Sequence, residues 1–381
     1  MMKIMTVEKR RLRIFILFLA AFLSGPGYAA SSSPDEGVNR ASAALIETDE
    51  ILKLDATMRR MVDQYVKPIS NKEQCAQALY DLILGPDQLA IKYDNSHTKT
   101  AAETIESGSG NCISIANAFI AMGRYADLDV HYLQVEVPDD WQRESDLYYQ
   151  FRHISAAIQI QPNEYLGIEF DWMGGIDPER TRKLTDEQGF SAFYSNRGVG
   201  LLMQDDMDAA MAHLLRAIEI YPDNSDNWTN IGVAYRRLNQ LDKAEDAYQQ
   251  ALRRNKSDLS ALNNLAILYQ MTGKTKDAEK YRKKLERYRR KNPYYMIQLS
   301  KQEIEKGNYS RALRWAKKAI KKHSEEHEFY FVAAKAYAYL GDTDEAMLNL
   351  ELAEEYAHQS RNRDQYSRKL ELLRDIRKSD N

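Results

Sequence analysis

The C-terminal half of the chain carries an apolar pattern that repeats every 34 residues. Alanine occupies one place in five consecutive periods, and a turn or helix-breaking residue stands five positions before it. The alanines are Ala210, Ala244, Ala278, Ala312 and Ala346, and the turn residues are Asp205, Asn239, Gly273, Gly307 and Gly341. This pattern predicts two amphipathic helices per period, which cross closely at the small residues. One unit cannot bury its apolar face alone, so the five are expected to stack into an all-α superhelical solenoid.

The period resembles the tetratricopeptide (TPR) repeat. The residues that carry the likeness best are Trp228, Gly232, Tyr235, Ala244, Tyr248 and Ala251. The array is predicted over 185–360, with units at 191–224, 225–258, 259–292, 293–326 and 327–360. Apolar residues on one face of 361–381 predict the C-terminal capping helix that such arrays need.

Asparagine recurs in one register of the first predicted helix of three units, at Asn196, Asn230 and Asn264. Its side chain both donates and accepts hydrogen bonds, so it suits an extended peptide backbone. The resemblance to peptide-clamping TPR domains implies a groove for a protein or peptide partner in the first three units. The alternative is that these asparagines only satisfy contacts between helices.

Helical and strand periodicities alternate in the first half of the chain. Helices are predicted at 41–66, 72–84 and 112–125, because apolar residues recur there at helical spacing. Strands are predicted at 129–137, 150–160 and 164–172, where apolar and polar residues alternate. Residues 41–184 are therefore expected to form a separate α+β domain before the solenoid.

The first thirty residues have the pattern of a signal peptide. The basic stretch EKRRLR precedes an apolar run from Ile14 to Leu23, and small residues follow at Gly27 and Ala29. We expect a signal peptide at 1–30, a flexible leader at 31–40 and a periplasmic or secreted mature protein. An uncleaved segment would instead anchor the protein in a membrane, although the apolar run is short for a permanent span.

Charge and composition narrow the function classes further. The net charge is −3, which gives no overall attraction to nucleic acid. Ten lysines and arginines lie within 274–291, and KKAIKKH follows from Lys317; such runs are most often solvated helix faces, and an acidic partner is the alternative. Seven scattered histidines and two cysteines indicate no metal site, and no cofactor-binding motif occurs.

Cys112 is the candidate nucleophile. It follows a glycine-rich turn, and Asn111 or Ser109 can cap a helix that begins at this cysteine. A cysteine in the first turn of a helix is favoured as the thiolate, and the N–H groups there can receive an oxyanion. A disulfide with Cys75 is the alternative in an oxidising compartment, and it would leave no nucleophile.

Two predicted strands supply a histidine and a carboxylate. His153 lies on the less apolar face of its strand, and Asp171 and Glu169 share the polar face of the next. A turn over 161–163 sets His153 directly opposite Asp171, with Glu169 diagonal to it, and a shift of two residues would favour another partner. Either carboxylate would orient the imidazole and stabilise its charged form. His131 lies on an apolar face and is expected to be structural.

The order of these residues resembles the transglutaminase-like superfamily, which has a papain-type cysteine–histidine–aspartate core. The likeness runs from about Thr98 to Asp171 and is carried by SHTKTAAETIESGSGNC, the helix after it and RHISAAI. It implies an α+β papain/transglutaminase-like domain in which Cys112 is the nucleophile, His153 the base, and Asp171 or Glu169 the orienting acid.

The activity that this resemblance implies is thiol acyl transfer. A peptidase or amidase is favoured over a transglutaminase, and the TPR array would recruit a protein partner or substrate. The alternative is a non-catalytic TPR adaptor that carries a degenerate transglutaminase-like domain.

Overall fold

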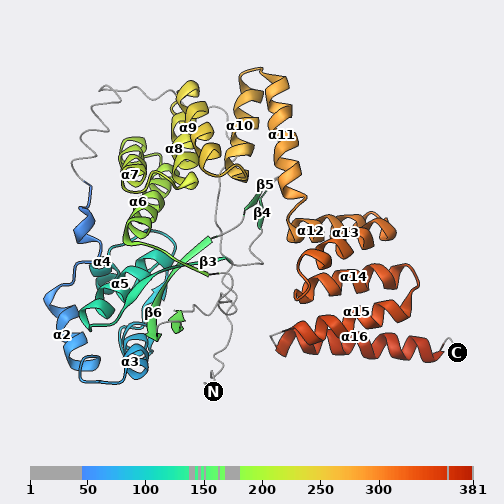
Figure 1. The fold of residues 1–381 in the computed structure, drawn as a ribbon, viewed down its shortest axis with the longest axis horizontal. Helices are drawn as coiled ribbons and strands as arrows, with labels where there is room; N and C mark the ends of the chain where they lie inside the picture. Colours follow the sequence, from blue (N-terminus) through green and yellow to red (C-terminus); the bar gives the residue numbers. More distant parts are fainter. Residues whose placement is uncertain are drawn as a thin grey trace.

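A computed structural model describes residues 45–136, 142–144, 147–149, 152–161, 164–167, 181–357 and 360–379. It contains a mixed α/β region that ends at strand β8, followed by the helices α6 to α16 (Figure 1). Among the described helices, none has the length and apolar character needed to cross a bilayer. The predicted signal peptide and leader lie outside the described residues.

Each α-helix of the first region begins at a capping side chain, whereas the short 3₁₀ helix η1 has none. They are η1 (Thr48–Glu50), α2 (Ala56–Tyr65), α3 (Lys72–Leu84), α4 (Ala101–Ser107) and α5 (Cys112–Tyr125). The predicted bounds of α3 and α5 are confirmed. The single helix predicted over 41–66 is wrong, because the Asp55 side chain accepts hydrogen bonds from the N–H groups of Thr57 and Met58 and starts α2 there.

Four antiparallel strands form the main sheet, in the order β7-β6-β3-β8. Their bounds are β3 (Val130–Glu136), β6 (Arg152–Gln161), β7 (Glu164–Gly167) and β8 (Thr181–Lys183). Two short pairs lie apart from it: β1 (Lys92–Tyr93) with β2 (Ser109–Gly110), and β4 (Gln142–Glu144) with β5 (Leu147–Tyr149). Strand β8 was missed by sequence reasoning because three residues show no alternation.

The register between β6 and β7 agrees with the one predicted from the turn over 161–163. Ala157 pairs with Gly167, and Ile158 pairs with Leu166. An irregularity lies near the turn, between Gln159 and Gln161. The rest of the predicted third strand, 168–172, lies outside the described residues.

Helix α5 packs against one face of this sheet. The Tyr132 hydroxyl of β3 donates a hydrogen bond of 2.5 Å to the Asn117 side chain of α5, and both residues are fully buried. A Cβ at Gly123 would lie only 2.5 Å from Val130 Cγ2, so the end of α5 approaches β3 as closely as glycine permits. Phe119, on the same helix, belongs to the core.

The second region consists of helix pairs with a regular turn. The pairs are α6 (Asp186–Met203) with α7 (Met207–Ile220), α8 (Ser225–Arg237) with α9 (Leu241–Arg254), α10 (Leu259–Met271) with α11 (Thr275–Arg289), α12 (Pro293–Glu305) with α13 (Tyr309–Lys322), and α14 (His327–Tyr339) with α15 (Thr343–Tyr356). Each of the five predicted turn residues has a positive φ, between 57° and 81°, the left-handed conformation that ends a helix. Helix α16 (Ser360–Ser379) follows at the stretch predicted to cap the array.

The first helix pair packs directly on the α/β region. Phe193 and Tyr194 of α6 share a buried cluster with Ile51 and with Ile113 of α5. The Tyr194 hydroxyl donates to the carbonyl oxygen of Ile46, and Gly189 lets α6 approach the Tyr132 ring. The start of α5 and the first helix of the array therefore share one core.

Candidate functional site

Cys112 is the first residue of α5. It is half-buried, and Asn111 caps the helix by accepting a hydrogen bond of 3.0 Å from the Ser114 N–H. Gly108 ends α4 with a φ of 63°, which reverses the chain before the cysteine. Among the described residues, no hydrogen-bond acceptor is found for the N–H groups of Cys112 and Ile113. The thiol therefore stands at the positive end of a helix beside two available donors.

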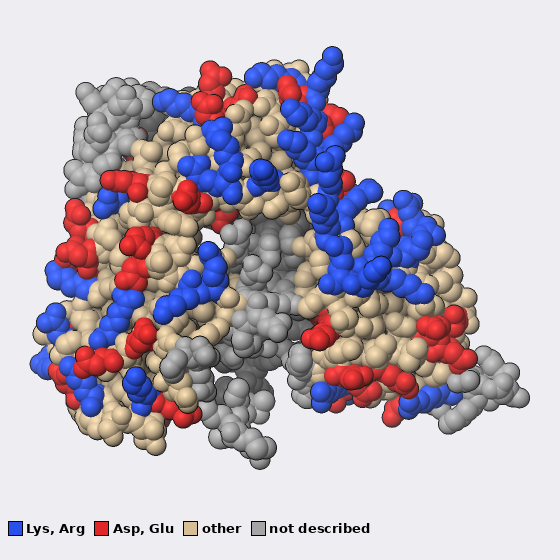
Figure 2. All heavy atoms as spheres, viewed as in Figure 1, with Lys and Arg blue, Asp and Glu red and all other residues tan. Residues whose placement is uncertain are grey.

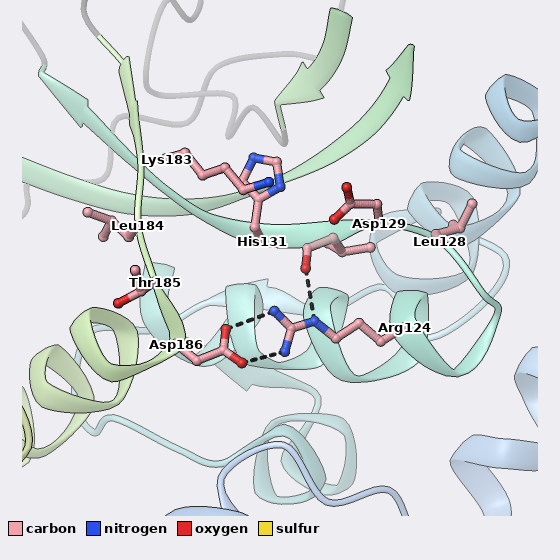
Figure 3. Close-up of a pocket in the computed structure, with 9 residues that line it drawn as sticks. Arg124, Leu128, Asp129, His131, Lys183, Leu184, Thr185 and Asp186 are labelled. Atoms are coloured by element: carbon pink, nitrogen blue, oxygen red, sulfur yellow. Dashed lines mark hydrogen bonds and ion pairs between the residues drawn. The ribbon is translucent and has the colours of Figure 1, made fainter. Parts of the chain in front are cut away.

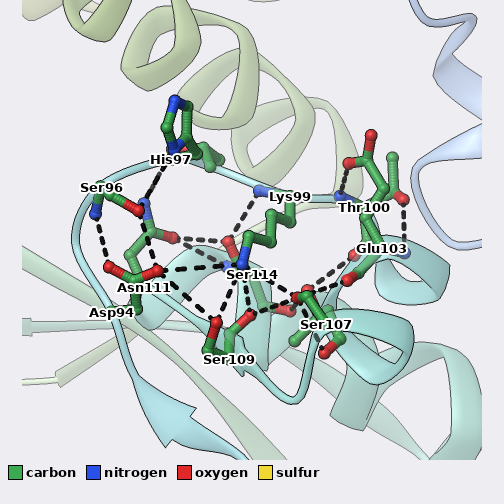
Figure 4. Close-up of polar contacts among 12 residues, drawn as sticks. Asp94, Ser96, His97, Lys99, Thr100, Glu103, Ser107, Ser109, Asn111 and Ser114 are labelled. Atoms are coloured by element: carbon green, nitrogen blue, oxygen red, sulfur yellow. Dashed lines mark hydrogen bonds and ion pairs between the residues drawn. The ribbon is translucent and has the colours of Figure 1, made fainter.

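A polar network holds the loop of residues 94–100 against the start of α5 (Figure 4). Asn111 Nδ2 donates to Thr98 Oγ1 at 2.8 Å, while Asn111 Oδ1 also accepts from Ser114 Oγ at 2.8 Å. The N–H of Lys99 donates to Ser114 Oγ at 2.8 Å. Both ends of the buried Asn111 amide are thus engaged within the protein, and its role is to position the loop and helix.

Lys99 fixes the turn that precedes the cysteine, a role that sequence reasoning missed. Its ammonium donates to Ser107 Oγ at 2.9 Å and to both the carbonyl oxygen and the hydroxyl of Ser109 at 3.0 Å. The side chain is 17% exposed. A single lysine among the serines of SHTKTAAETIESGSG was the only available signal.

His97 lies on the same loop, next to Thr98, and is exposed. Its Nδ1 is 3.1 Å from Ser96 Oγ, which donates to the Asp94 carboxylate at 2.8 Å. Hydrogen bonds from the Ser96 backbone and side chain, followed by the nearby Lys99 ammonium, hold the pKa of Asp94 below its usual value. This series of hydrogen bonds favours the His97 tautomer that carries its proton on Nδ1, which leaves Nε2 as an acceptor.

His153 lies on β6, which pairs with β3 in an unbroken register. The register sets Tyr132 opposite Ala156, and Tyr132 bonds to α5. Side chains alternate along a strand, so His153, three residues from Ala156, starts on the face opposite α5. His131 shares that face, and Figure 3 shows its ring on the side of the sheet away from Arg124 of α5. The structure thus brings β6 against α5, and by strand alternation the Cβ of His153 lies on the other face of the sheet.

The structure does not describe the predicted orienting acid of the triad. Asp171 and Glu169 lie outside the described residues. The disulfide alternative is not what the structure shows, since Cys75 and Cys112 are both free thiols. Cys75 is buried in α3, where burial raises the pKa of its thiol and makes it a poor nucleophile.

A cavity of about 350 Å³ lies at the β3–β8 edge rather than beside Cys112. Its lining includes Arg124 and Asp186, whose ion pair of 2.7 Å raises the pKa of the guanidinium (Figure 3). His131 also lines it, and burial followed by the charge of Lys183 lowers the pKa of this histidine to about 4. His131 is therefore neutral near pH 7, in agreement with a structural role.

The three groove asparagines lie on the first helices of their units. Asn196 of α6 is exposed, whereas Asn230 of α8 and Asn264 of α10 are half-buried. Asn230 Nδ2 donates to Ser195 Oγ of the preceding unit at 3.1 Å, so this asparagine does bond between helices. Within the described part of the chain, no group of His, Cys, Asp and Glu side chains is arranged to hold a metal ion.

Family models match both regions of the chain. The model of the transglutaminase-like superfamily matches residues 59–168, a stretch that includes Cys112 and His153. Models of tetratricopeptide repeats match 225–258, 247–280 and 298–360. The first match begins in α2 and ends beside β7, and the repeat matches begin at α8.

Individual relatives match the chain only in part. Human protein O-mannosyl-transferase TMTC3 is 28% identical over 155 residues, which cover 39% of this chain and 17% of that protein. PilF of Pseudomonas aeruginosa is 14% identical with a TM-score of 0.27, covering 50% of this chain and 94% of its own. YrrB, a TPR protein with an unusual peptide-binding site, is 16% identical with a TM-score of 0.25. This match covers 47% of the present chain and 92% of YrrB. None of these likenesses carries an activity over to this chain.

The family matches and the fold agree on the organisation of the molecule. The α/β region with a cysteine at a helix start coincides with the first match, and the helix pairs from α8 onward coincide with the others. The chain therefore contains a transglutaminase-like domain, matched over 59–168, followed by tetratricopeptide repeats, matched within 225–360.

Proposed function

We propose that the protein is an exported thiol acyl-transfer enzyme, most simply a peptidase or amidase, whose TPR array binds a protein partner or substrate. The observation that carries the proposal is the position of Cys112 at the first residue of α5, beside the N–H groups of Cys112 and Ile113. A helix start favours the thiolate, and the two N–H groups are donors for the oxyanion that forms on attack.

The reaction follows from this geometry. The Cys112 sulfur forms a bond to the carbonyl carbon of an amide, and the electron pair of the carbonyl moves onto its oxygen. When the carbonyl re-forms, the carbon–nitrogen bond breaks and the amine leaves with a proton from an imidazolium. Water then attacks the thioester and gives a proton to the imidazole. The carbon–sulfur bond breaks, which releases a carboxylic acid and returns the Cys112 thiolate beside the imidazolium. An amine in place of water would make the same site a transglutaminase.

The candidate functions differ in whether a histidine side chain can serve as the base for Cys112. The family order assigns the base to His153, but that side chain starts on the face of the sheet opposite α5. This observation favours the second candidate, a TPR adaptor with a degenerate domain. His97 is a further imidazole, because its loop is bonded to Asn111 at the start of α5.

Thiol labelling separates these functions. In a Cys75→Ala background, iodoacetamide is expected to label Cys112 below about pH 8, faster than an ordinary cysteine. The effects of His153→Gln and His97→Gln on this labelling show which imidazole serves the thiol. The double variant Cys75→Ala/Cys112→Ala gives the background signal. The single variant Cys112→Ala tests whether buried Cys75 stays unlabelled. Labelling no faster than that of a free thiol, and unaffected by either histidine change, would support the adaptor.

Export and partner binding have their own tests. N-terminal sequencing of the protein recovered from the periplasm or medium is expected to begin near Ala30. An intact N-terminus on membrane-bound protein would contradict export as a cleaved form. For the groove, the combined change of Asn196, Asn230 and Asn264 to alanine is expected to abolish partner capture in a pull-down. An unchanged pull-down would remove the groove from the proposal.

A further inference from the structure

A band of basic side chains covers the second helices of two successive repeat units, α11 and α13 (Figure 2). Helix α13 carries six lysines and arginines and no aspartate or glutamate. Exposed Arg282 and Arg311 of these helices contact Gln270 and Glu303. We call ten other exposed cations of α11, its C-cap residue and α13 the basic band: Lys276, Lys280, Lys283, Arg287, Arg290, Arg314, Lys317, Lys318, Lys321 and Lys322. The chain as a whole has a net charge of −3, so the positive charge of this surface is opposite in sign to the net charge of the protein.

The charges of α13 repel one another. Arg314, Lys317, Lys318, Lys321 and Lys322 follow the spacing that places residues on one helix face, and like charges at that spacing destabilise a helix. Within the described residues, no carboxylate lies within 4 Å of Arg314, Lys318, Lys321 or Lys322, whereas Lys283 and Arg290 of the band have acidic partners one turn away. These four cations of α13 are therefore not compensated by a carboxylate of the described chain, and their charge suits an anionic partner.

The aromatic side chains within the band argue against single-stranded nucleic acid as this partner. Arg290 Cζ lies 5.9 Å and Lys318 Nζ 4.8 Å from the ring centroid of Trp315. Lys280 and Lys284 lie 5.7 and 4.9 Å from that of Tyr281. Bases bind such surfaces by stacking on open aromatic faces, but here the chain's own cations lie over these rings.

The composition of the band also argues against insertion into a membrane. Surface helices that bind bilayers place large apolar side chains among their basic residues. Among the described residues, no exposed large apolar side chain belongs to α11 or α13; the nearest of known position is Tyr339 of α14, whose ring stacks on that of Tyr309 at the start of α13, away from the four lysines near its end. A charged surface without an apolar anchor fits a polar, flexible polyanion better than an acyl-chain interface.

We propose that the basic band binds an acidic polypeptide segment of a partner protein. Helices α11 and α13 have 15 and 14 residues, so each offers a basic face about 20 Å long. The groove asparagines lie on first helices and the basic band on second helices, so the two surfaces are distinct. This inference is independent of acyl transfer, because no residue of the band belongs to the α/β region.

Fluorescence anisotropy with a labelled poly-glutamate peptide tests the inference. The full chain with Arg314→Gln, Lys318→Gln, Lys321→Gln and Lys322→Gln is expected to bind at least about tenfold more weakly than the wild type at low salt. The matched control changes four exposed cations of the first region, Arg59, Arg60, Lys72 and Lys92, to glutamine and alters the net charge equally. Its affinity is expected to stay within about twofold of the wild type, and binding by the wild type is expected to weaken as salt rises.

The other outcomes overturn the inference. Equally weakened peptide binding in both variants would show that net charge alone attracts the peptide. No peptide binding by the wild type would contradict the proposal. Stronger binding to oligothymidine or to phosphatidylglycerol vesicles than to the peptide would assign the band to nucleic acid or to membrane. Thermal unfolding of both variants checks that they are folded: each is expected to unfold in a cooperative transition like that of the wild type.

Discussion

The two regions of this chain depend on contacts at different sequence distances. In the repeat array the helices pack mainly on helices next to them in sequence, except that α11 and α12 make little contact, and the turn at Asp205 recurs in the same conformation in every unit. In the transglutaminase-like domain, β3 pairs with β6 and with β8, which lies about fifty residues further along the chain. The comparison teaches that a local repeat specifies a scaffold, whereas a site depends on distant pairings that no short pattern contains.

The largest predicted effect concerns the junction between these regions. Phe193→Ala removes a fully buried ring from the cluster that α6 shares with Ile113, and is expected to lower the free energy of unfolding by about 3–5 kcal/mol. Hydrogen exchange should show α5 losing protection along with α6. The matched variant Phe329→Ala empties a fully buried site within the array and should leave α5 protected. Equal protection of α5 in both variants would show that the first unit belongs to the array alone.

The second prediction concerns how the stability of the transglutaminase-like domain depends on pH. His131 has a pKa of about 4 when folded, against about 6.5 when unfolded. Between these values the unfolded chain binds more protons, so stability is full above about pH 6.5 and falls by up to about 3 kcal/mol toward pH 4. His131→Gln should flatten this part of the urea-unfolding profile. Lys183→Gln should flatten it less, because burial is the larger cause, and an unchanged slope in His131→Gln would contradict the assignment.

The third prediction separates close packing from helix propensity within the array. A Cβ at Gly232 would lie 2.5 Å from the Tyr248 ring, so Gly232→Ala is expected to destabilise the protein by about 1–3 kcal/mol. Gly200→Ala is the control, because nothing lies within 4 Å of its Cβ and alanine should stabilise α6 by about 0.5–1 kcal/mol. Urea unfolding measures both. A similar result for the two variants would mean that the helices of a unit can separate without cost.

The smallest predicted effect tests the groove asparagines. Asn230→Ala is expected to cost about 1 kcal/mol, because it removes the hydrogen bond to Ser195. Asn196→Ala should change stability by less than about 0.5 kcal/mol, because Asn196 is exposed. If both changes are neutral in thermal unfolding, the hydrogen bond of Asn230 is not structural and its side chain is free to serve a peptide.

Local signals in the sequence predicted the elements that depend on local contacts. The bounds of α3 and α5 followed from apolar residues at helical spacing, and the structure shows that Asn71 and Asn111 cap the first turns of these helices. The register of β6 with β7 followed from one turn and one alternation. The prediction failed at 41–66, where Asp55 interrupts an apolar periodicity, and at β8, which exists only because β3 offers it an edge.

The sequence by itself determined that Cys112 begins a helix, that His153 alternates with the apolar residues of its strand, and that five units repeat. Only the tertiary structure decided which face of the sheet α5 covers, and hence that His153 starts on the other one. The physical reason is that alternation relates a side chain to its own strand. The side on which a distant helix packs is set by long-range burial, here by Tyr132 against Asn117.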